Sequence, residues 1–167
     1  GGTSGNATAP STPATAATTT TIPLADLPAC PTGALDDASV PVELVFWHAM
    51  GTDLEPVLVA MTDAYNTSQD RVRVRLENQV GYESAIDKYI AASASSRPNL
   101  IQLPEYALQE FADSATFVPA GACIDDSGYD ISSFLPRALG TYEIEGVQWG
   151  MPFNASSPVL FYNRTMF

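Results

Sequence analysis

The chain has 167 residues, of which 46% are hydrophobic, so it can bury one packed core and is not disordered throughout. Its 19 Asp and Glu residues outnumber its 7 Lys and Arg residues, and the formal net charge is -12 at pH 7. This charge excludes nucleic acids and anionic lipid surfaces as partners, because both bind to basic protein surfaces.

The first 41 residues are expected to precede the folded domain. Residues 1–21 consist almost wholly of Gly, Ala, Thr, Ser, Pro and Asn. Such a composition cannot bury enough surface to offset the conformational entropy lost on folding, which predicts a flexible tether. Residues 22–41 contain turn-forming residues and predict a lead-in with little regular structure: Pro23, Pro28, Pro31, Gly33 and Pro41.

A strand, helix and strand are predicted next. Residues 42–47 are rich in β-branched and aromatic side chains and predict a strand. Thr52 and Glu55 have the spacing of a helix-capping box. The apolar residues that follow at helical intervals predict an amphipathic helix packed on a sheet: Leu54, Val57, Leu58, Met61 and Tyr65. Residues 71–76 alternate arginines with apolar residues, which predicts a strand with one wet face and a parallel βαβ unit.

The same alternation continues through the middle of the chain. Residues 82–95 predict a second helix that buries Ile86, Tyr89 and Ile90, and residues 99–103 predict a third strand. The fold class is therefore α/β with a mainly parallel central sheet.

The rest of the predicted lobe is less regular. A short helix is expected around Phe111, and residues 131–139 predict a further helical turn or two. Glu145 and Gly146 are typical of a hairpin turn. We expect residues 42–153 to form one α/β lobe.

The stretch from residue 151 joins a polar crossing to an apolar run. Gly150 and Pro152 break regular structure, residues 154–157 carry small side chains that include two hydroxyls and an amide, and strand chemistry resumes at residues 159–162. Residues 154–167 therefore predict a hinge crossing and the first strand of a second lobe that is only begun in this chain.

Four stretches occur in the same order as in one known family: Val-Phe-Trp-His-Ala-Met at 45–50, Gly-Tyr-Glu at 81–83, Ile-Gln-Leu-Pro-Glu at 101–105, and the run 151–167. Together they cover about residues 42–167 and resemble family 1 of the extracellular solute-binding proteins of ABC importers. This family contains the glycerol-3-phosphate-binding and maltose-type sugar-binding proteins, and the resemblance is nearest to the glycerol-3-phosphate branch.

The resemblance implies that the protein binds and delivers a solute without catalysing a reaction. It implies a type II periplasmic-binding-protein-like lobe, in an exported protein that captures a sugar or a glycerophosphate-like polyol between two lobes and delivers it to an ABC permease. No cofactor and no metal are expected, and the chain contains only one histidine. The start of the chain resembles a bacterial lipoprotein just after its lipidated cysteine, so contact with the membrane is expected only through a lipid anchor.

Three positions are candidate ligand contacts, and each also has a structural interpretation. Tyr82 could stack on a sugar or be a core tyrosine at a helix start, and the family's Gly-Asn-Tyr or Gly-Ser-Tyr contact favours the ligand. Here Gly81 directly precedes the tyrosine, so the spacing departs slightly from that pattern. Glu105 could accept hydrogen bonds from two vicinal hydroxyls or be a first-turn glutamate. Ser156, or Ser157 as a one-residue alternative, could reach a ligand oxygen or simply permit bending.

The two cysteines, Cys30 and Cys123, leave two alternatives open. In an exported protein they can form one disulfide that fastens the lead-in to the lobe, or they can be two buried free thiols.

An enzyme is the alternative function. No nucleophile elbow and no phosphate-binding lysine motif occurs in the sequence. A glycosidase would need a second carboxylate to act with Glu105, and no residue is singled out for that role. We therefore predict that the protein is not an enzyme. The alternative is an extracellular carbohydrate-active enzyme or its carbohydrate-binding module.

Overall fold

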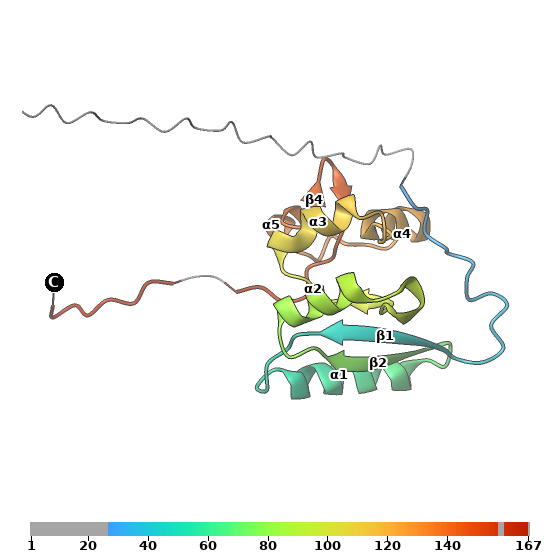
Figure 1. The fold of residues 1–167 in the computed structure, drawn as a ribbon, viewed down its shortest axis with the longest axis horizontal. Coiled ribbons are helices and arrows are strands. Elements are labelled where there is room, and N and C mark those ends of the chain that lie inside the picture. The colour runs from blue at the N-terminus through green and yellow to red at the C-terminus, as the bar shows by residue number, and fades with distance from the viewer. Residues whose placement is uncertain (1–26, 157–158, 167) are drawn as a thin grey trace, which may run out of the picture.

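The computed structural model describes residues 27–156 and 159–166 (Figure 1). The predicted tether at residues 1–21 and the candidate Ser157 lie outside the described residues. Residues 27–41 contain turns and bends but neither helix nor strand, as the lead-in prediction requires.

A three-stranded parallel sheet forms the centre of the lobe. Its strands are β1 (Val42–His48), β2 (Val72–Asn78) and β3 (Leu100–Ile101), in the order β2-β1-β3. The register between β1 and β2 runs from Val42 opposite Val72 to His48 opposite Asn78. The predicted α/β lobe with a mainly parallel sheet is confirmed. The third strand is shorter than predicted, because only Leu100 and Ile101 pair with β1.

Helices cover both faces of the sheet, with α1 (Glu55–Ser68) on one side and α2 (Tyr82–Ala91) on the other (Figure 1). The core lies on the α2 side. Its buried residues come from β1, α2 and the turn and helix after β3, and they are Trp47, Ile86, Tyr89, Ala107 and Phe111. Of the residues predicted to be buried on the second helix, Ile90 is 56% exposed, so that prediction is wrong. The helix also ends at Ala91 rather than Ser95, and a separate 3-10 turn, η2 (Ala94–Ser96), follows it.

The first helix departs from its predicted cap and its predicted burial. It begins at Glu55 after Leu54, and no side chain caps its first turn, so Thr52 and Glu55 do not form a capping box. Only Leu58 of the apolar stripe is buried, whereas Val57 and Met61 are 56% and 63% exposed. The helix therefore rests on the sheet through one edge of its apolar stripe.

The region after β3 is built from short pieces. A 3-10 turn, η3 (Glu105–Ala107), leads into α3 (Leu108–Asp113), as predicted around Phe111. Two further helices are α4 (Ala120–Ser127) and α5 (Pro136–Gly140), and β4 (Glu143–Ile144) pairs with β5 (Val147–Gln148) in the predicted hairpin. The sequence prediction missed α4 and placed the start of α5 too early.

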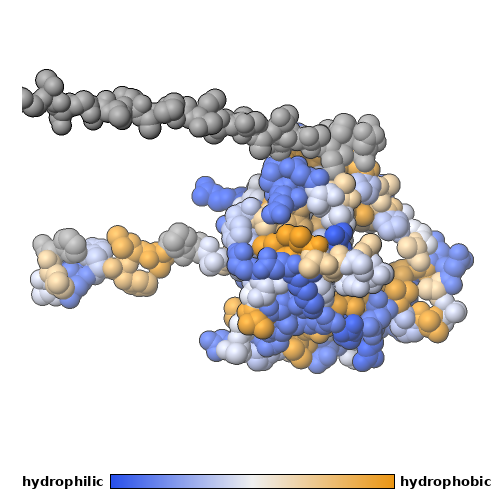
Figure 2. All heavy atoms as spheres, viewed as in Figure 1, coloured by the Kyte–Doolittle hydropathy of each residue, from blue (hydrophilic) through white to orange (hydrophobic). Residues whose placement is uncertain are grey.

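Two connections complete the lobe. Cys30 and Cys123 are joined in a disulfide, the first of the two alternatives, and it fastens the lead-in to α4. The segment 159–166 contains no strand, so the strand predicted at 159–162 is wrong for this structure. Figures 1 and 2 show this segment standing clear of the folded body, with apolar side chains in the open. A strand needs a neighbour to pair its backbone groups, and no strand lies beside this segment in the part of the chain described.

Candidate functional site

The three strands of the sheet end at one edge, and this edge is the candidate site. Because the strands are parallel, the loops after His48, Asn78 and Ile101 all leave from their carboxyl ends. Ligands of open α/β sheets bind outside this edge. We call it the carboxyl edge.

Gln102 joins the segments that meet at the carboxyl edge. Its side chain is buried, with the residue only 5% exposed, and its oxygen accepts a hydrogen bond from the Ala49 backbone N–H at 2.9 Å. Its Nε2 donates to Asn154 Oδ1 at 2.7 Å and lies 3.4 Å from the Tyr82 hydroxyl. One amide therefore contacts the loop after β1, the start of α2 and the crossing segment, which are far apart in the sequence.

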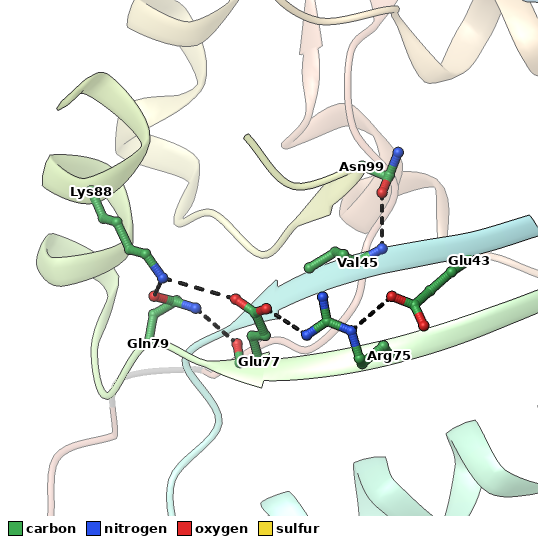
Figure 3. A network of polar contacts seen from close by, with 7 residues as sticks. All are labelled: Glu43, Val45, Arg75, Glu77, Gln79, Lys88 and Asn99. Atoms are coloured by element: carbon green, nitrogen blue, oxygen red, sulfur yellow. Dashed lines mark hydrogen bonds and ion pairs between the residues drawn. The ribbon is translucent and has the colours of Figure 1, made fainter. Parts of the chain in front are cut away.

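Hydrogen bonds from several elements hold the loop between β2 and α2 that precedes Tyr82. The Gln79 backbone N–H donates to the His48 carbonyl at 2.8 Å, which continues the ladder between β1 and β2 beyond Asn78. The Gln79 side chain accepts a hydrogen bond from Lys88 Nζ at 2.9 Å (Figure 3). Tyr82 is half-buried and begins α2 directly after Gly81. The backbone position of Tyr82 is thus fixed by both the strand before it and the helix after it.

Lys88 also connects α2 to the face of the sheet. Its Nζ lies 3.9 Å from the centre of the Trp47 ring and 3.9 Å from the Glu77 carboxylate. Arg75 of β2 binds both Glu77 of β2 and Glu43 of β1, which extends the chain of charges across the two strands (Figure 3). The hydrogen bond from Arg75 holds the pKa of Glu77 below its ordinary value. This network lies on the wet face that the arginine alternation predicted, and it positions α2 rather than offering free groups to a ligand.

Glu105 lies close to two tyrosines of the carboxyl edge. It begins η3 directly after Pro104, and its carboxylate has no hydrogen-bond partner within residues 27–156 and 159–166. Burial raises the pKa of Tyr142, and the charges of Glu105 and Tyr82 raise it further. The pKa of Tyr106 is raised mainly by its hydrogen bond to Glu83, at 2.6 Å, with Glu105 among the smaller causes. Open carboxylate acceptors beside phenol hydroxyls can bind the hydroxyl groups of a ligand.

The predicted site residues are only partly brought together. Tyr82 contacts Gln102, and Glu105 and Tyr82 each raise the pKa of Tyr142 by their charge. Ser156 is exposed and makes no hydrogen bond to another described residue, although Asn154, two positions earlier, is fastened to Gln102. The hydrogen bond from Gln102 thus fastens the crossing segment at Asn154.

Sequence reasoning missed the roles of Gln102 and Tyr142. The signal for Gln102 was available, because a polar residue interrupts the apolar run from Leu100 to Leu103. No local pattern marks Tyr142, which comes from the turn before the hairpin and reaches Glu105 only through the tertiary fold.

His48 is a packing residue at the end of β1. It is 1% exposed, and its ring meets Phe46, which in turn packs on Phe153, just before the crossing segment, at 5.6 Å between ring centres. Burial lowers its pKa, and the nearby Glu55 carboxylate offsets part of that shift. The His48 imidazole is therefore packed inside the lobe.

Neither a metal centre nor a membrane span is found in the described part of the chain. Across residues 27–156 and 159–166, no group of three or more His, Cys, Asp or Glu could hold a metal ion. No helix in these ranges is both long enough and apolar enough to cross a membrane.

The fold and the polar carboxyl edge define a lobe of a ligand-binding protein, and sequence comparison assigns the family. The pattern of the bacterial extracellular solute-binding proteins matches residues 60–167, which is more than half of the chain. The chain therefore belongs to this family.

Two relatives are similar to this chain over most of its length. The sn-glycerol-3-phosphate-binding periplasmic protein UgpB of Yersinia pestis bv. Antiqua (strain Antiqua) is 29% identical over 136 residues, which cover 78% of this chain and 31% of the relative. UgpB of Pectobacterium atrosepticum is 30% identical over 135 residues, which cover 78% of this chain and 30% of the relative. The chain thus spans less than a third of the length of these curated relatives.

Solved structures show the same fold. The family 1 extracellular solute-binding protein of Alicyclobacillus acidocaldarius aligns with a TM-score of 0.59 at 18% identity, over 69% of this chain and 28% of that one. The sugar-binding protein MalE of Xanthomonas citri aligns with a TM-score of 0.57 at 26% identity, over 66% of this chain and 28% of that one. The lobe therefore has the predicted type II periplasmic-binding-protein fold. All four proteins are binding proteins by name, so the enzyme alternative is not favoured.

Proposed function

We propose that this chain supplies one ligand-binding lobe of an exported receptor that captures a small hydroxylated solute for an ABC importer. The observation that carries the proposal is the hydrogen bonding of Gln102, because it gathers the loop after β1, Tyr82 and the crossing segment at one edge. Membership of the extracellular solute-binding family supports export and a permease partner.

The chemistry of the edge favours the hydroxyl groups of the ligand. The carboxylate of Glu83 accepts a hydrogen bond from the Tyr106 hydroxyl, and the Glu105 carboxylate acts on the hydroxyls of Tyr106 and Tyr142. Carboxylates accept hydrogen bonds from vicinal hydroxyls but repel a phosphate group at close range. We propose that this lobe binds the sugar or glycerol part of the ligand, and that any phosphate is held by groups outside this edge. The names of the relatives support a sugar or a glycerol-3-phosphate-like polyol.

Capture is proposed to proceed by hinge closure without chemical change. The crossing segment leaves the lobe beside Asn154, which Gln102 fixes, so bending would occur beyond that anchor. Binding energy between two lobes would then favour the closed state, which the permease recognises.

The test is calorimetric titration of the complete protein and its variants with glycerol-3-phosphate, glycerophosphodiesters, maltose and longer maltooligosaccharides. Tyr82→Ala and Glu105→Ala are each expected to weaken the best binder by about 1 to 3 kcal/mol, through lost stacking or an unpaired ligand hydroxyl. Glu110→Ala is the matched control, because Glu110 is an exposed glutamate of the same helical region and lies within α3 rather than at its start. Unchanged affinity in both test variants would remove the assigned site.

A further inference from the structure

Val80 has a backbone conformation that is unfavourable for its residue type. Its φ angle is 70°, in the left-handed region, and among the described residues only Ala115 and Glu145 share this feature without being glycine. A β-branched side chain is strongly disfavoured there, because its branch collides with the backbone. Glycine or asparagine would adopt this conformation at lower cost.

The surrounding loop maintains this conformation. The Val80 backbone N–H donates to Asn78 Oδ1 at 2.7 Å. On one side, the buried Gln79 is held by the His48 carbonyl and by Lys88. On the other side, Gly81 leads at once into Tyr82 and α2. The strain is therefore imposed by a loop that is fixed at both ends.

The Val80 side chain gains nothing from packing within the lobe that would offset this strain. The residue is 91% exposed, although it is apolar, and it projects from the loop that follows β2 at the carboxyl edge. Strained residues persist where the strain serves a function, and they gather at ligand sites. Val80 is two positions from Tyr82, the aromatic residue of the candidate site.

We propose that Val80 is a specificity-determining contact of the ligand site, which covers an apolar C–H face of the bound solute beside Tyr82. This inference rests on the proposed function. It assigns the isopropyl group a role that the hydrogen-bonding groups cannot fill, because carboxylates and hydroxyls bind the polar edge of a polyol and leave its C–H face in water. The strained backbone conformation holds the group out from the edge, where a bound solute can bury it.

The test compares two substitutions at Val80 with one at a second strained position. Val80→Gly and Val80→Asn both fit a positive φ angle, so both are expected to raise the midpoint temperature of unfolding of the complete protein. Ala115→Gly is the control for relief of strain alone. The neighbouring Thr116 contacts Tyr89, about two helical turns along α2 from Tyr82, so this position is remote from the carboxyl edge.

The affinity for the ligand is expected to distinguish the variants at Val80 from the variant at Ala115. By calorimetric titration with the best binder of the panel, Val80→Gly and Val80→Asn are expected to bind about 3- to 10-fold more weakly than the wild type, as expected for partial loss of a buried isopropyl group. Ala115→Gly is expected to bind as the wild type does. Wild-type affinity in Val80→Gly would overturn the inference.

The same titrations distinguish failure of this inference from failure of the proposed function. A wild-type protein that binds no member of the panel would overturn both. A wild type whose affinity falls on Tyr82→Ala and stays unchanged on Val80→Gly would overturn only the role of Val80.

Discussion

Gln102 is the single residue on which the geometry of the carboxyl edge depends most. Replacing it by leucine, which is similar in size, would leave the Ala49 N–H and Asn154 Oδ1 without their partner. We expect Gln102→Leu to lower the free energy of unfolding by about 1 to 3 kcal/mol, measured by urea denaturation, because buried polar groups left unpaired keep their desolvation cost.

Gln109→Leu is the matched control for this variant. Gln109 is an exposed glutamine whose amide, among the residues that the structure describes, bonds only to Asp113 on the same helix. We expect a change within about 0.5 kcal/mol, as for most surface substitutions. Equal effects of the two substitutions would show that Gln102 does not anchor the edge.

His48 gives the stability of the lobe a pH dependence with a definite sign. Burial lowers the pKa of its imidazole in the folded state below the ordinary value of 6.5. The unfolded chain therefore binds a proton at higher pH than the folded chain does, and the free energy of unfolding falls as the pH drops from about 6.5 toward the folded pKa.

The fall in unfolding free energy that is due to His48 can be distinguished from the effects of other titrating groups. Glu77 and Asp130 have pKa values held below their ordinary 4.5 and 3.8, so they lose their stabilising contributions only at lower pH. We expect His48→Gln to remove the slope of stability against pH between about pH 7 and pH 5, measured by chemical denaturation. A slope that persists in this variant would assign the titration to other groups.

At the scale of the elements, the disulfide fastens an irregular lead-in to a helix. Cys30 and Cys123 are 93 residues apart in the sequence, so the bond restricts a long loop of the unfolded chain. We expect the double variant Cys30→Ser and Cys123→Ser to lose about 2 to 5 kcal/mol of unfolding free energy. Wild-type protein in a reductant should show the same loss, and an unchanged unfolding transition in both samples would contradict this role.

The strands and helices with clear periodicity were predictable from the sequence. The alternation of Arg73 and Arg75 with Val72 and Val74 placed the second strand and its wet face correctly. The helix α4 was missed because Ala120–Ser127 contains a glycine and no apolar repeat, and it follows Pro119 without a capping side chain. The capping box at α1 failed because spacing alone does not ensure that a side chain reaches the backbone.

At the scale of the whole molecule, the position of the candidate site follows from the predicted topology, and its contacts do not. Parallel strands bring their carboxyl ends together whatever their side chains are, so topology alone pointed to the loops around Tyr82 and Glu105. The hydrogen bonds of Gln102 to Tyr82 and Asn154 depend on how segments about 20 and 50 residues apart pack against each other. No local sequence pattern indicates which residues so far apart in the chain come into contact.

The central claim is that the carboxyl edge binds a small hydroxylated solute and releases it unchanged. The most direct measurement is calorimetric titration of the complete wild-type protein with the sugar and glycerophosphate panel, followed by recovery of the bound solute and its identification by mass spectrometry. We expect saturable binding of at least one member of the panel, recovered intact. Conversion of that solute to a product, or no saturable binding by any member, would contradict it.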